Sequence, residues 1–238
     1  MIRVQDLSKS FGSHRAVDHV SFEIETGEIV GFIGPNGAGK STTMRMLTGY
    51  LASDRGRAEV LGFDVSRHPL EVQRRIGYLP ESNPLYVDMR VRPFLRFVAE
   101  VRGIPRRERA AAVERAIELC ALQEVARKRI RECSKGYKQR VGLAQAVIHS
   151  PKVLILDEPT EGLDPNQRVV MRDLIQGFAK QGATVILSTH ILPEVELTCP
   201  RALMISRGRI VADGAPKKIS GPLGTLEQAF RQITQTKE

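Results

Sequence analysis

The sequence predicts an α/β fold built around a mostly parallel sheet with helices. Continuous apolar runs at residues 153–156 and 184–187 are typical of parallel strands that are buried on both faces. A third apolar run, at residues 29–33, leads into a glycine-rich loop, and a helical pattern begins at Ser41 directly after it. This order of strand, loop and helix predicts a core that holds a phosphate-binding loop.

Length and composition indicate one domain that carries an insertion. The chain has 238 residues, of which 42% are hydrophobic, and this is enough to bury a full core. We expect residues 1–81 and 151–218 to form the nucleotide-binding core, including an antiparallel β part near the N-terminus. Residues 82–150 are expected to form an inserted helical subdomain, and residues 219–238 a short tail.

Further patterns predict the elements beside the parallel core. Strict alternation of polar and apolar residues over Val20–Glu25 is typical of a half-exposed antiparallel strand. Residues 202–205 and 209–212 form a predicted hairpin that turns at Arg207-Gly208. A last short helix is expected over residues 225–230.

The middle of the chain changes to helical patterns. Residues 106–127 place Val113, Ile117 and Cys120 at helical spacing, so one helix is expected there. Residues 93–98 predict another helix, with proline in its first turn. These two helices are the predicted body of the insertion.

The net charge of +9 is concentrated in the same region. Residues 74–140 hold 17 Lys and Arg against 8 Asp and Glu, whereas the rest of the chain is close to balanced. Such a segment can face phosphates, anionic lipid headgroups or acidic loops of a partner. A solvated, arginine-rich helical surface is the alternative interpretation.

Cysteine usage and hydropathy indicate an intracellular protein. The three cysteines, Cys120, Cys133 and Cys199, lack metal-ligand spacing and are interpreted as reduced thiols in core or loop positions. No apolar run approaches the roughly 18 residues that span a bilayer, and the N-terminus lacks the layout of a signal peptide. We therefore expect a chain that stays in the cytoplasm.

The glycine-rich loop fits the pattern Gly-x-x-x-x-Gly-Lys-Ser, which predicts a P-loop NTPase core. Its backbone N–H groups can surround phosphate oxygens, and the positive end of the following helix also favours an anion. Lys40 is predicted to reach the β- and γ-phosphates of a nucleoside triphosphate, and Ser41 to bind Mg²⁺. The predicted nucleotide-binding residues are Gly34, Pro35, Asn36, Gly37, Ala38, Gly39, Lys40, Ser41 and Thr42.

Two adjacent carboxylates, Asp157 and Glu158, follow the apolar run at residues 153–156. At the carboxyl end of a buried strand, Asp157 is predicted to hold Mg²⁺ directly or through water. Glu158 is predicted to act as the general base on the attacking water. The alternative is that both acids only open the turn that contains Pro159.

At this point the residues resemble the nucleotide-binding subunit of ATP-binding cassette (ABC) transporters over nearly the whole chain. The family signature, typically Leu-Ser-Gly-Gly-Gln, corresponds here to Cys133–Tyr137, in which Ser134 and Gly136 are retained. The resemblance implies that these two residues contact ATP held by the opposite subunit. Read without the family, Ser134 is a helix N-cap, which is compatible with that role because a capped helix end also favours anions.

Other positions match the family in order along the chain. Asp164, in Glu161-Gly162-Leu163-Asp164, resembles the aspartate of the loop that crosses the subunit interface. His190 occupies the place of the residue that senses the γ-phosphate, and Phe11 that of the ring that stacks on adenine. A structural histidine and a core residue at a strand end are the alternatives for these two positions.

The stretch Tyr78-Leu79-Pro80-Glu81 resembles the ABC-2 exporter branch of the family, which moves cargo out of bacteria. Most family members carry glutamine where this chain has Glu81. A carboxylate there can accept a hydrogen bond from Mg²⁺-bound water, so Glu81 is a predicted metal-site residue. The resemblance therefore favours export over import.

The resemblance implies an ATP- and Mg²⁺-dependent ATPase that works as a homodimer or with a paralogous cassette. Each phosphate-binding loop would be covered by the partner's signature segment, so that ATP stabilises the closed dimer and hydrolysis releases it. An integral membrane permease subunit is the implied partner, and it would hold this chain on the cytosolic face of the membrane. Residues 81–89, Phe94 and Phe97 are the predicted docking surface.

A different class of function stays open from the sequence. A soluble ABC ATPase of iron–sulfur assembly, repair or translation could use the basic segment on nucleic acid. Against it, the chain has one cassette, no coiled-coil arm and no aromatic platform among its basic residues, so no nucleic-acid partner is expected. A sensor that binds ATP without hydrolysis is the third reading, which Glu158 argues against.

Overall fold

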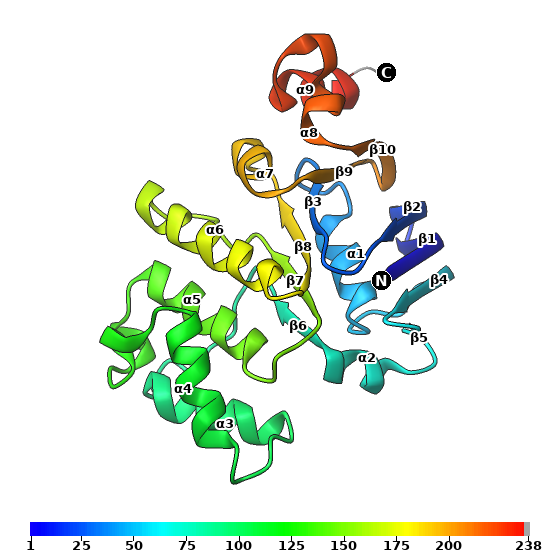
Figure 1. Cartoon of the computed structure of the whole chain (residues 1–238). Helices are drawn as coiled ribbons and strands as arrows, with labels where there is room; N and C mark the ends of the chain where they lie inside the picture. Colours follow the sequence, from blue (N-terminus) through cyan, green and yellow to red (C-terminus); the bar gives the residue numbers. More distant parts are fainter. Residues whose placement is uncertain (236–238) are drawn as a thin grey trace.

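The computed structural model describes residues 1–235, whose strands form two sheets (Figure 1). The smaller sheet has the order β2-β1-β4-β5 and the larger β10-β9-β3-β8-β7-β6. The strands are β1 (Ile2–Phe11), β2 (His14–Ile24), β3 (Ile29–Ile33), β4 (Arg55–Val60), β5 (Phe63–Asp64), β6 (Ile76–Leu79), β7 (Val153–Asp157), β8 (Thr184–Thr189), β9 (Arg201–Ser206) and β10 (Arg209–Gly214). The α-helices are α1 (Lys40–Leu47), α2 (Pro69–Arg75), α3 (Val91–Val101), α4 (Arg109–Leu119), α5 (Lys135–Val147), α6 (Pro165–Lys180), α7 (Leu192–Thr198), α8 (Pro216–Ser220) and α9 (Leu226–Gln235).

The larger sheet confirms the predicted parallel core. Strands β9, β3, β8, β7 and β6 run parallel, and every residue of β7 and β8 is buried, as their continuous apolar runs require. The predicted hairpin is β9 and β10. Its turn residues Arg207 and Gly208 both have left-handed backbone conformations, with φ of 49° and 78°. Two such residues form the turn that matches the twist of paired strands.

The smaller sheet is antiparallel and packs on the side of α1 that faces away from the larger sheet (Figure 1). The alternation at Val20–Glu25 predicted only the second half of β2, which begins at His14. Side chains from both sheets and from α1 form one hydrophobic cluster that includes Phe22, Phe32 and Met44. The start of α1, where the phosphate-binding loop ends, is therefore fixed between two sheets.

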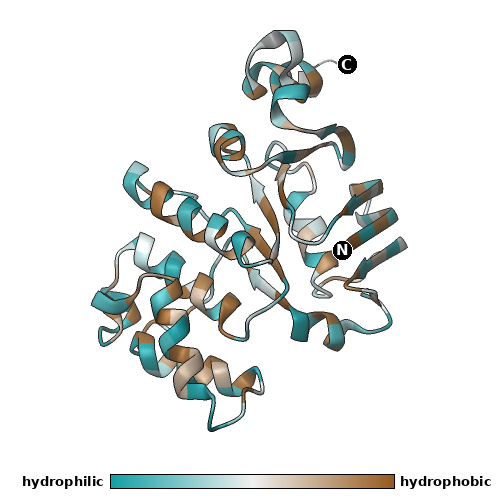
Figure 2. Ribbon diagram, in the orientation of Figure 1, coloured by the Kyte–Doolittle hydropathy of each residue, from teal (hydrophilic) through white to brown (hydrophobic). Residues whose placement is uncertain are grey.

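The insertion consists of α3, α4 and α5 with two short 3-10 turns. The helix predicted over residues 106–127 is wrong in its last part, because α4 ends at Leu119 and the chain turns at Ala121, whose φ is 50°. A 3-10 turn at residues 123–125 follows. The apolar positions predicted for α4 are nevertheless buried, and Figure 2 shows apolar residues along the inner sides of these helices.

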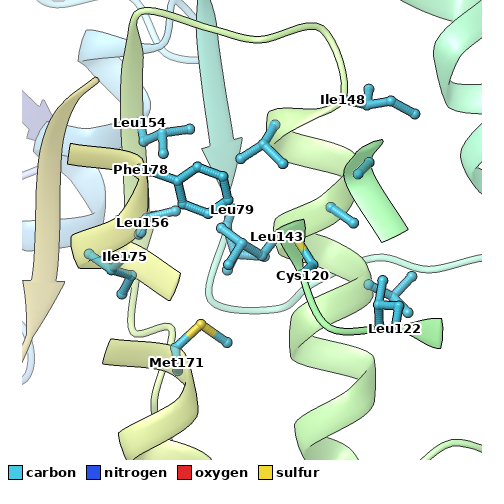
Figure 3. Close-up of a cluster of buried hydrophobic side chains, with 14 of the residues drawn as sticks. Leu79, Cys120, Leu122, Leu143, Ile148, Leu154, Leu156, Met171, Ile175 and Phe178 are labelled. Atoms are coloured by element: carbon cyan, nitrogen blue, oxygen red, sulfur yellow. The ribbon is translucent and has the colours of Figure 1, made fainter. Parts of the chain in front are cut away.

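A continuous hydrophobic cluster joins the insertion to the larger sheet (Figure 3). Leu79 of β6 and Leu154 and Leu156 of β7 meet Leu143 of α5, and Phe178 of α6 closes the cluster from the opposite side. Burial of such side chains is worth about 1.5–3 kcal/mol each. Helix α5 is thus held against the strands that end at the functional site.

The C-terminal part ends in α9, which is longer than the helix predicted over residues 225–230. Leu226 and Ala229 are buried, and the backbone N–H of Leu226 donates to Glu196 Oε1 of α7 at 2.9 Å. This contact ties α9 to the helix that follows β8. Within residues 1–235, no helix combines the length and the apolar character needed to cross a membrane.

Candidate nucleotide-binding site

The phosphate-binding loop (residues 34–41) connects β3 to α1, as the sequence predicts. Gly39 has a φ of 106°, and a Cβ atom at this position would lie 2.3 Å from the carbonyl oxygen of Ala16. Only glycine fits there. The backbone N–H of Gly208 donates to the carbonyl oxygen of Ala38 at 3.0 Å, so the β9–β10 turn supports the loop from its other side.

Lys40 is buried at the start of α1 and is held by the loop itself. Its Nζ donates to the carbonyl oxygens of Gly34, at 2.8 Å, and Pro35, at 3.3 Å. The same ammonium lies 3.6 Å from Glu158 Oε1. Burial and these hydrogen bonds fix the Lys40 side chain, so its positive charge is preorganised to bind a phosphate.

Glu158 follows β7 and forms a pair with His190. Its backbone N–H donates to the carbonyl oxygen of Ser188 at 2.9 Å, and its Oε1 lies 3.0 Å from Nδ1 of His190. The side chain is 4% exposed, and within residues 1–235 its Oε2 has no hydrogen-bond partner. The φ of Glu158 is 50°, a strained conformation that concentrates at functional sites. The carboxylate is thus fixed and still has a free acceptor.

The region around Asp157 fits a magnesium ion. Burial raises the pKa of Asp157, while the hydroxyls of Ser188 and Ser41 and the charge of Lys40 oppose that shift. In the described part of the chain, buried Asp157 Oδ1 has no hydrogen-bond partner. Such a carboxylate, with the Ser41 hydroxyl beside it, supplies oxygen ligands that Mg²⁺ prefers.

A protein-only metal cage is not present in residues 1–235, where no group of three or more His, Cys, Asp or Glu side chains could hold a metal ion. This is expected for Mg²⁺ at a nucleotide site, because the ion usually keeps waters and phosphate oxygens as ligands.

One cavity of about 440 Å³ brings most of the predicted residues of the core together, but its lining does not include Gly34, Pro35, Ala38 or Asp157. Phe11, Glu81, Glu158 and His190 line it with the phosphate-binding loop. Phe11 ends β1 and is 51% exposed, so its ring is open to a flat ligand rather than packed in the core. The loop and helix residues that line this nucleotide cavity are Asn36, Gly37, Gly39, Lys40, Ser41 and Thr42.

Sequence reasoning missed three residues of the nucleotide cavity: His14, Ala16 and Glu161. His14 and Ala16 lie on β2, whose first half carried no clear alternation. Glu161 follows Glu158 by three residues and stands at the start of the segment that resembles the interface loop. A second carboxylate three residues after Glu158 could have been used to predict that Glu161 lines the same cavity.

Ser134, Gly136 and Asp164 do not line the nucleotide cavity in the described structure. Ser134 is the N-cap of α5 and accepts from the backbone N–H of Tyr137 at 3.4 Å, as expected. Asp164 is the N-cap of α6 and accepts from the backbone N–H of Gln167 at 2.9 Å. Gly136 is buried against the Gln167 side chain, so the first turns of α5 and α6 meet at this glutamine. The roles of these three residues toward ATP stay predictions.

A second cavity, of about 790 Å³, lies between α2, α3 and the loop after β6. We call it the apolar groove. Phe94, part of the predicted docking surface, is buried in the insertion, whereas Phe97 is 41% exposed and its ring lies 5.6 Å from that of Tyr86. Apolar side chains that line the groove include Leu70, Leu85, Tyr86, Phe94, Phe97 and Val101.

Arg102 places a positive charge in the apolar groove. Its guanidinium donates to the carbonyl oxygen of Gln73 at 2.9 Å, and burial lowers its pKa. Among residues 1–235 this guanidinium has the Gln73 carbonyl oxygen as its hydrogen-bond partner, and no carboxylate pairs with it. A partly desolvated cation without a counter-charge favours an anionic group on whatever fills the groove.

The family model and the related sequences point to the same protein family. The family model described as ABC transporter matches residues 17–161. The chain is 37% identical to the probable multidrug ABC transporter ATP-binding protein YbhF of Escherichia coli (strain K12), over 98% of this chain and 41% of that protein. It is also 37% identical to the Nod factor export ATP-binding protein I of Paraburkholderia xenovorans (strain LB400), over 92% of this chain and 72% of that protein. The chain therefore spans less than half the length of the first of these relatives.

Comparison with solved structures agrees with the sequence match. One structure, described as that of an ATP binding subunit of ABC transporter, has a TM-score of 0.87 and 29% sequence identity. The match covers 98% of this chain and 99% of that chain. The likeness therefore includes both sheets and the helical insertion, not only the segment around the phosphate-binding loop.

Proposed function

This chain belongs to the ABC transporter family, and we propose that it binds and hydrolyses ATP to power export through a separate membrane subunit. The observation that carries this proposal is the meeting of Lys40, Glu158 and His190 at one cavity beside the phosphate-binding loop. The name of the Nod factor relative and the stretch Tyr78–Glu81, which resembles the ABC-2 exporter branch, both favour export.

In the proposed reaction, Lys40 holds the β- and γ-phosphates and Glu158 accepts the proton of the attacking water. His190 orients the Glu158 carboxylate, to which its Nδ1 already lies close. Ser41 and Asp157 would hold Mg²⁺, with Glu81 as a further oxygen donor in the same cavity, and the ion would supply positive charge to the phosphates. Phe11 stacks on the base.

We propose that a second copy completes each site. Ser134, Gly136 and Asp164 lie outside the nucleotide cavity of their own chain, at the joined first turns of α5 and α6. Ser134 and Asp164 are exposed and available to another chain. ATP then shifts the equilibrium toward a closed dimer because it contacts both chains only in that state.

The membrane subunit is proposed to dock in the apolar groove, which places the chain at the cytosolic face of the membrane. Exposed Tyr86 and Phe97 supply apolar contact, and Arg102 favours a carboxylate on the incoming segment. The relatives are named as transport proteins, which argues against the alternative of a soluble ATPase in iron–sulfur assembly, repair or translation.

A capture experiment tests this function. The Glu158→Gln chain, loaded with ATP and Mg²⁺, is used to recover partners from detergent-solubilised membranes, and mass spectrometry identifies them. We expect one multi-span membrane protein in stoichiometric amount, with recovery weakened by Arg102→Gln. Arg106→Gln is the matched control, since Arg106 is exposed and does not line the groove. Recovery of only soluble proteins or nucleic acid would contradict the transporter role.

A further inference from the structure

The loop after β6 is fastened to α5 by one side chain. Asn83 Nδ2 donates to the carbonyl oxygen of Lys138 at 2.9 Å and to Gln139 Oε1 at 3.1 Å. Both partners are acceptors, so the amide must present its NH₂ group to α5. The backbone N–H of Asn83 also donates to the carbonyl oxygen of Pro80 at 3.1 Å, which closes the loop into a turn.

Gly142, in the middle of α5, makes room for this side chain. A Cβ atom on Gly142 would lie 2.3 Å from Asn83 Oδ1 and 2.4 Å from Nδ2. Glycine is unfavourable in a helix interior compared with alanine, so its presence here needs a local reason. Close approach of the Asn83 amide supplies that reason.

The contact lies between three functional parts of the chain. Glu81, two residues before Asn83, lines the nucleotide cavity. Leu85 and Tyr86, just after it, line the apolar groove. Helix α5, to which the amide is bonded, begins with the N-cap Ser134.

We propose that Asn83 is a positioning residue that holds the Glu81 loop on α5, so that the loop and the signature segment move as one unit. This inference rests on the proposed ATPase function. A segment seated on Tyr86 would act on the loop, and Asn83 would pass the displacement to Ser134. Neither the family signature nor the phosphate-binding loop contains Asn83 or Gly142.

Favourable and unfavourable terms nearly cancel at the Asn83 contact. Two hydrogen bonds favour it, but among the described residues the buried Asn83 Oδ1 has no partner. A buried acceptor without a partner costs about as much as a pair of hydrogen bonds contributes. The net contribution of the contact to stability is therefore small, so its expected effect is on where the loop is held and not on the stability of the fold.

A double-mutant cycle tests the proposal with the full chain. Asn83→Ala, Gly142→Ala and the double variant are compared with wild type for kcat, KM for ATP and Tm. Contacting residues show couplings of about 2- to 100-fold, whereas independent sites give additive effects. We expect Gly142→Ala to lower kcat at least about 3-fold, with KM within about 2-fold, because it displaces the amide and not the nucleotide.

In the Asn83→Ala background the added methyl group has room. There Gly142→Ala should leave kcat unchanged and raise Tm, whereas in wild type it should lower Tm. Gly177→Ala in α6 is the matched control, since beyond its chain neighbours and the adjacent helix backbone no atom of residues 1–235 lies within 4 Å of the added Cβ. That control should raise Tm slightly and leave kcat unchanged.

Additive effects on kcat in the cycle would overturn the positioning role, as would a kcat of Asn83→Ala equal to that of wild type. If Gly142→Ala changes Tm in the same direction in wild type and in the Asn83→Ala variant, the two residues do not interact. A wild-type chain that hydrolyses no ATP would instead overturn the proposed function itself. These results are distinguishable because Tm reports the contact without any turnover.

Discussion

The nucleotide cavity and the signature segment differ in how they are built. The phosphate chemistry depends on Lys40, which follows the loop after β3, on Asp157, which ends β7, and on His190, which follows β8. The buried core of the larger sheet fixes all three within one chain. Ser134 and Asp164 cap helices on the surface and, within residues 1–235, line neither the nucleotide cavity nor the apolar groove. The difference accords with our proposal that one copy prepares the phosphate chemistry and that a second copy supplies the final contacts.

The sharpest test of the first region is Glu158→Gln. We expect kcat to fall by about 10²- to 10⁴-fold, because the general base is lost, while ATP binding is unchanged. Phosphate release and binding of a fluorescent ATP analogue measure the two quantities. Glu161→Gln is the matched control in the same cavity and should lower kcat far less. Equal losses for both variants would contradict the assignment of the base.

A mixing experiment tests whether the second region acts on another chain. Ser134→Ala should remove the contact that this chain gives to ATP on a second copy, and Lys40→Ala should lose phosphate binding, each with a loss of about 100-fold or more. Mixed in equal amounts, they should recover about a quarter of the wild-type rate, since half of randomly formed dimers hold one complete site. No recovery in the mixture would contradict sites shared between two copies.

His149 gives a stability test at the junction between the insertion and the sheet. Burial and nearby Arg102 lower its pKa to about 4, and its Nε2 lies 3.0 Å from the carbonyl oxygen of Ile76. The unfolded chain protonates this histidine near pH 6.5, so stability is lost as the pH falls from about 6.5 to about 4, by up to about 3 kcal/mol.

His149→Gln, which can keep the donor to Ile76, should flatten this loss in urea unfolding measured across that pH range. His14→Gln is the matched control, because His14 is exposed and should leave the slope unchanged. If the free energy of unfolding of His149→Gln depends on pH as steeply as that of wild type, the acid sensitivity comes from other groups.

The smallest expected effect concerns Asp157. Because burial raises its pKa, the ionised carboxylate destabilises the nucleotide-free fold at neutral pH, and this cost fades as the pH falls. Asp157→Asn should therefore raise Tm without nucleotide by a few degrees, since about 1 kcal/mol shifts Tm by about 2–4 °C at this size. The further rise that Mg²⁺ and ATP give wild type should be lost.

Asp164→Asn is the control for this measurement, because asparagine also caps helices well and Tm should stay the same. A lower Tm for Asp157→Asn would show that the carboxylate stabilises the empty site, contrary to the effect of burial.

The sequence predicted those parts of the structure that depend on a few consecutive residues. The phosphate-binding loop, the carboxylates at the end of β7 and the hairpin at Arg207-Gly208 depend on short patterns that the fold keeps. The signature segment was identified only by resemblance, because Ser134 alone reads as an ordinary helix cap. The end of α4 was missed since nothing in Ala121 marks a left-handed turn.

Contacts between distant segments could not be predicted. The pairing of Asn83 with Gly142 depends on how closely α5 approaches the loop after β6, and a helix glycine alone does not name its neighbour. The unpaired charge of Arg102 is visible only when the groove around it is known. Neither pattern periodicity nor composition contains this information.

The junction at Gln167 has a consequence for how two copies would associate. Its side chain covers Gly136 at the start of α5, and its backbone N–H is bonded to Asp164 at the start of α6. The two helix ends that would meet a second chain are therefore joined through one residue. In the proposed dimer an arriving copy would gain both sets of contacts together, so we expect cooperative association with few half-closed arrangements.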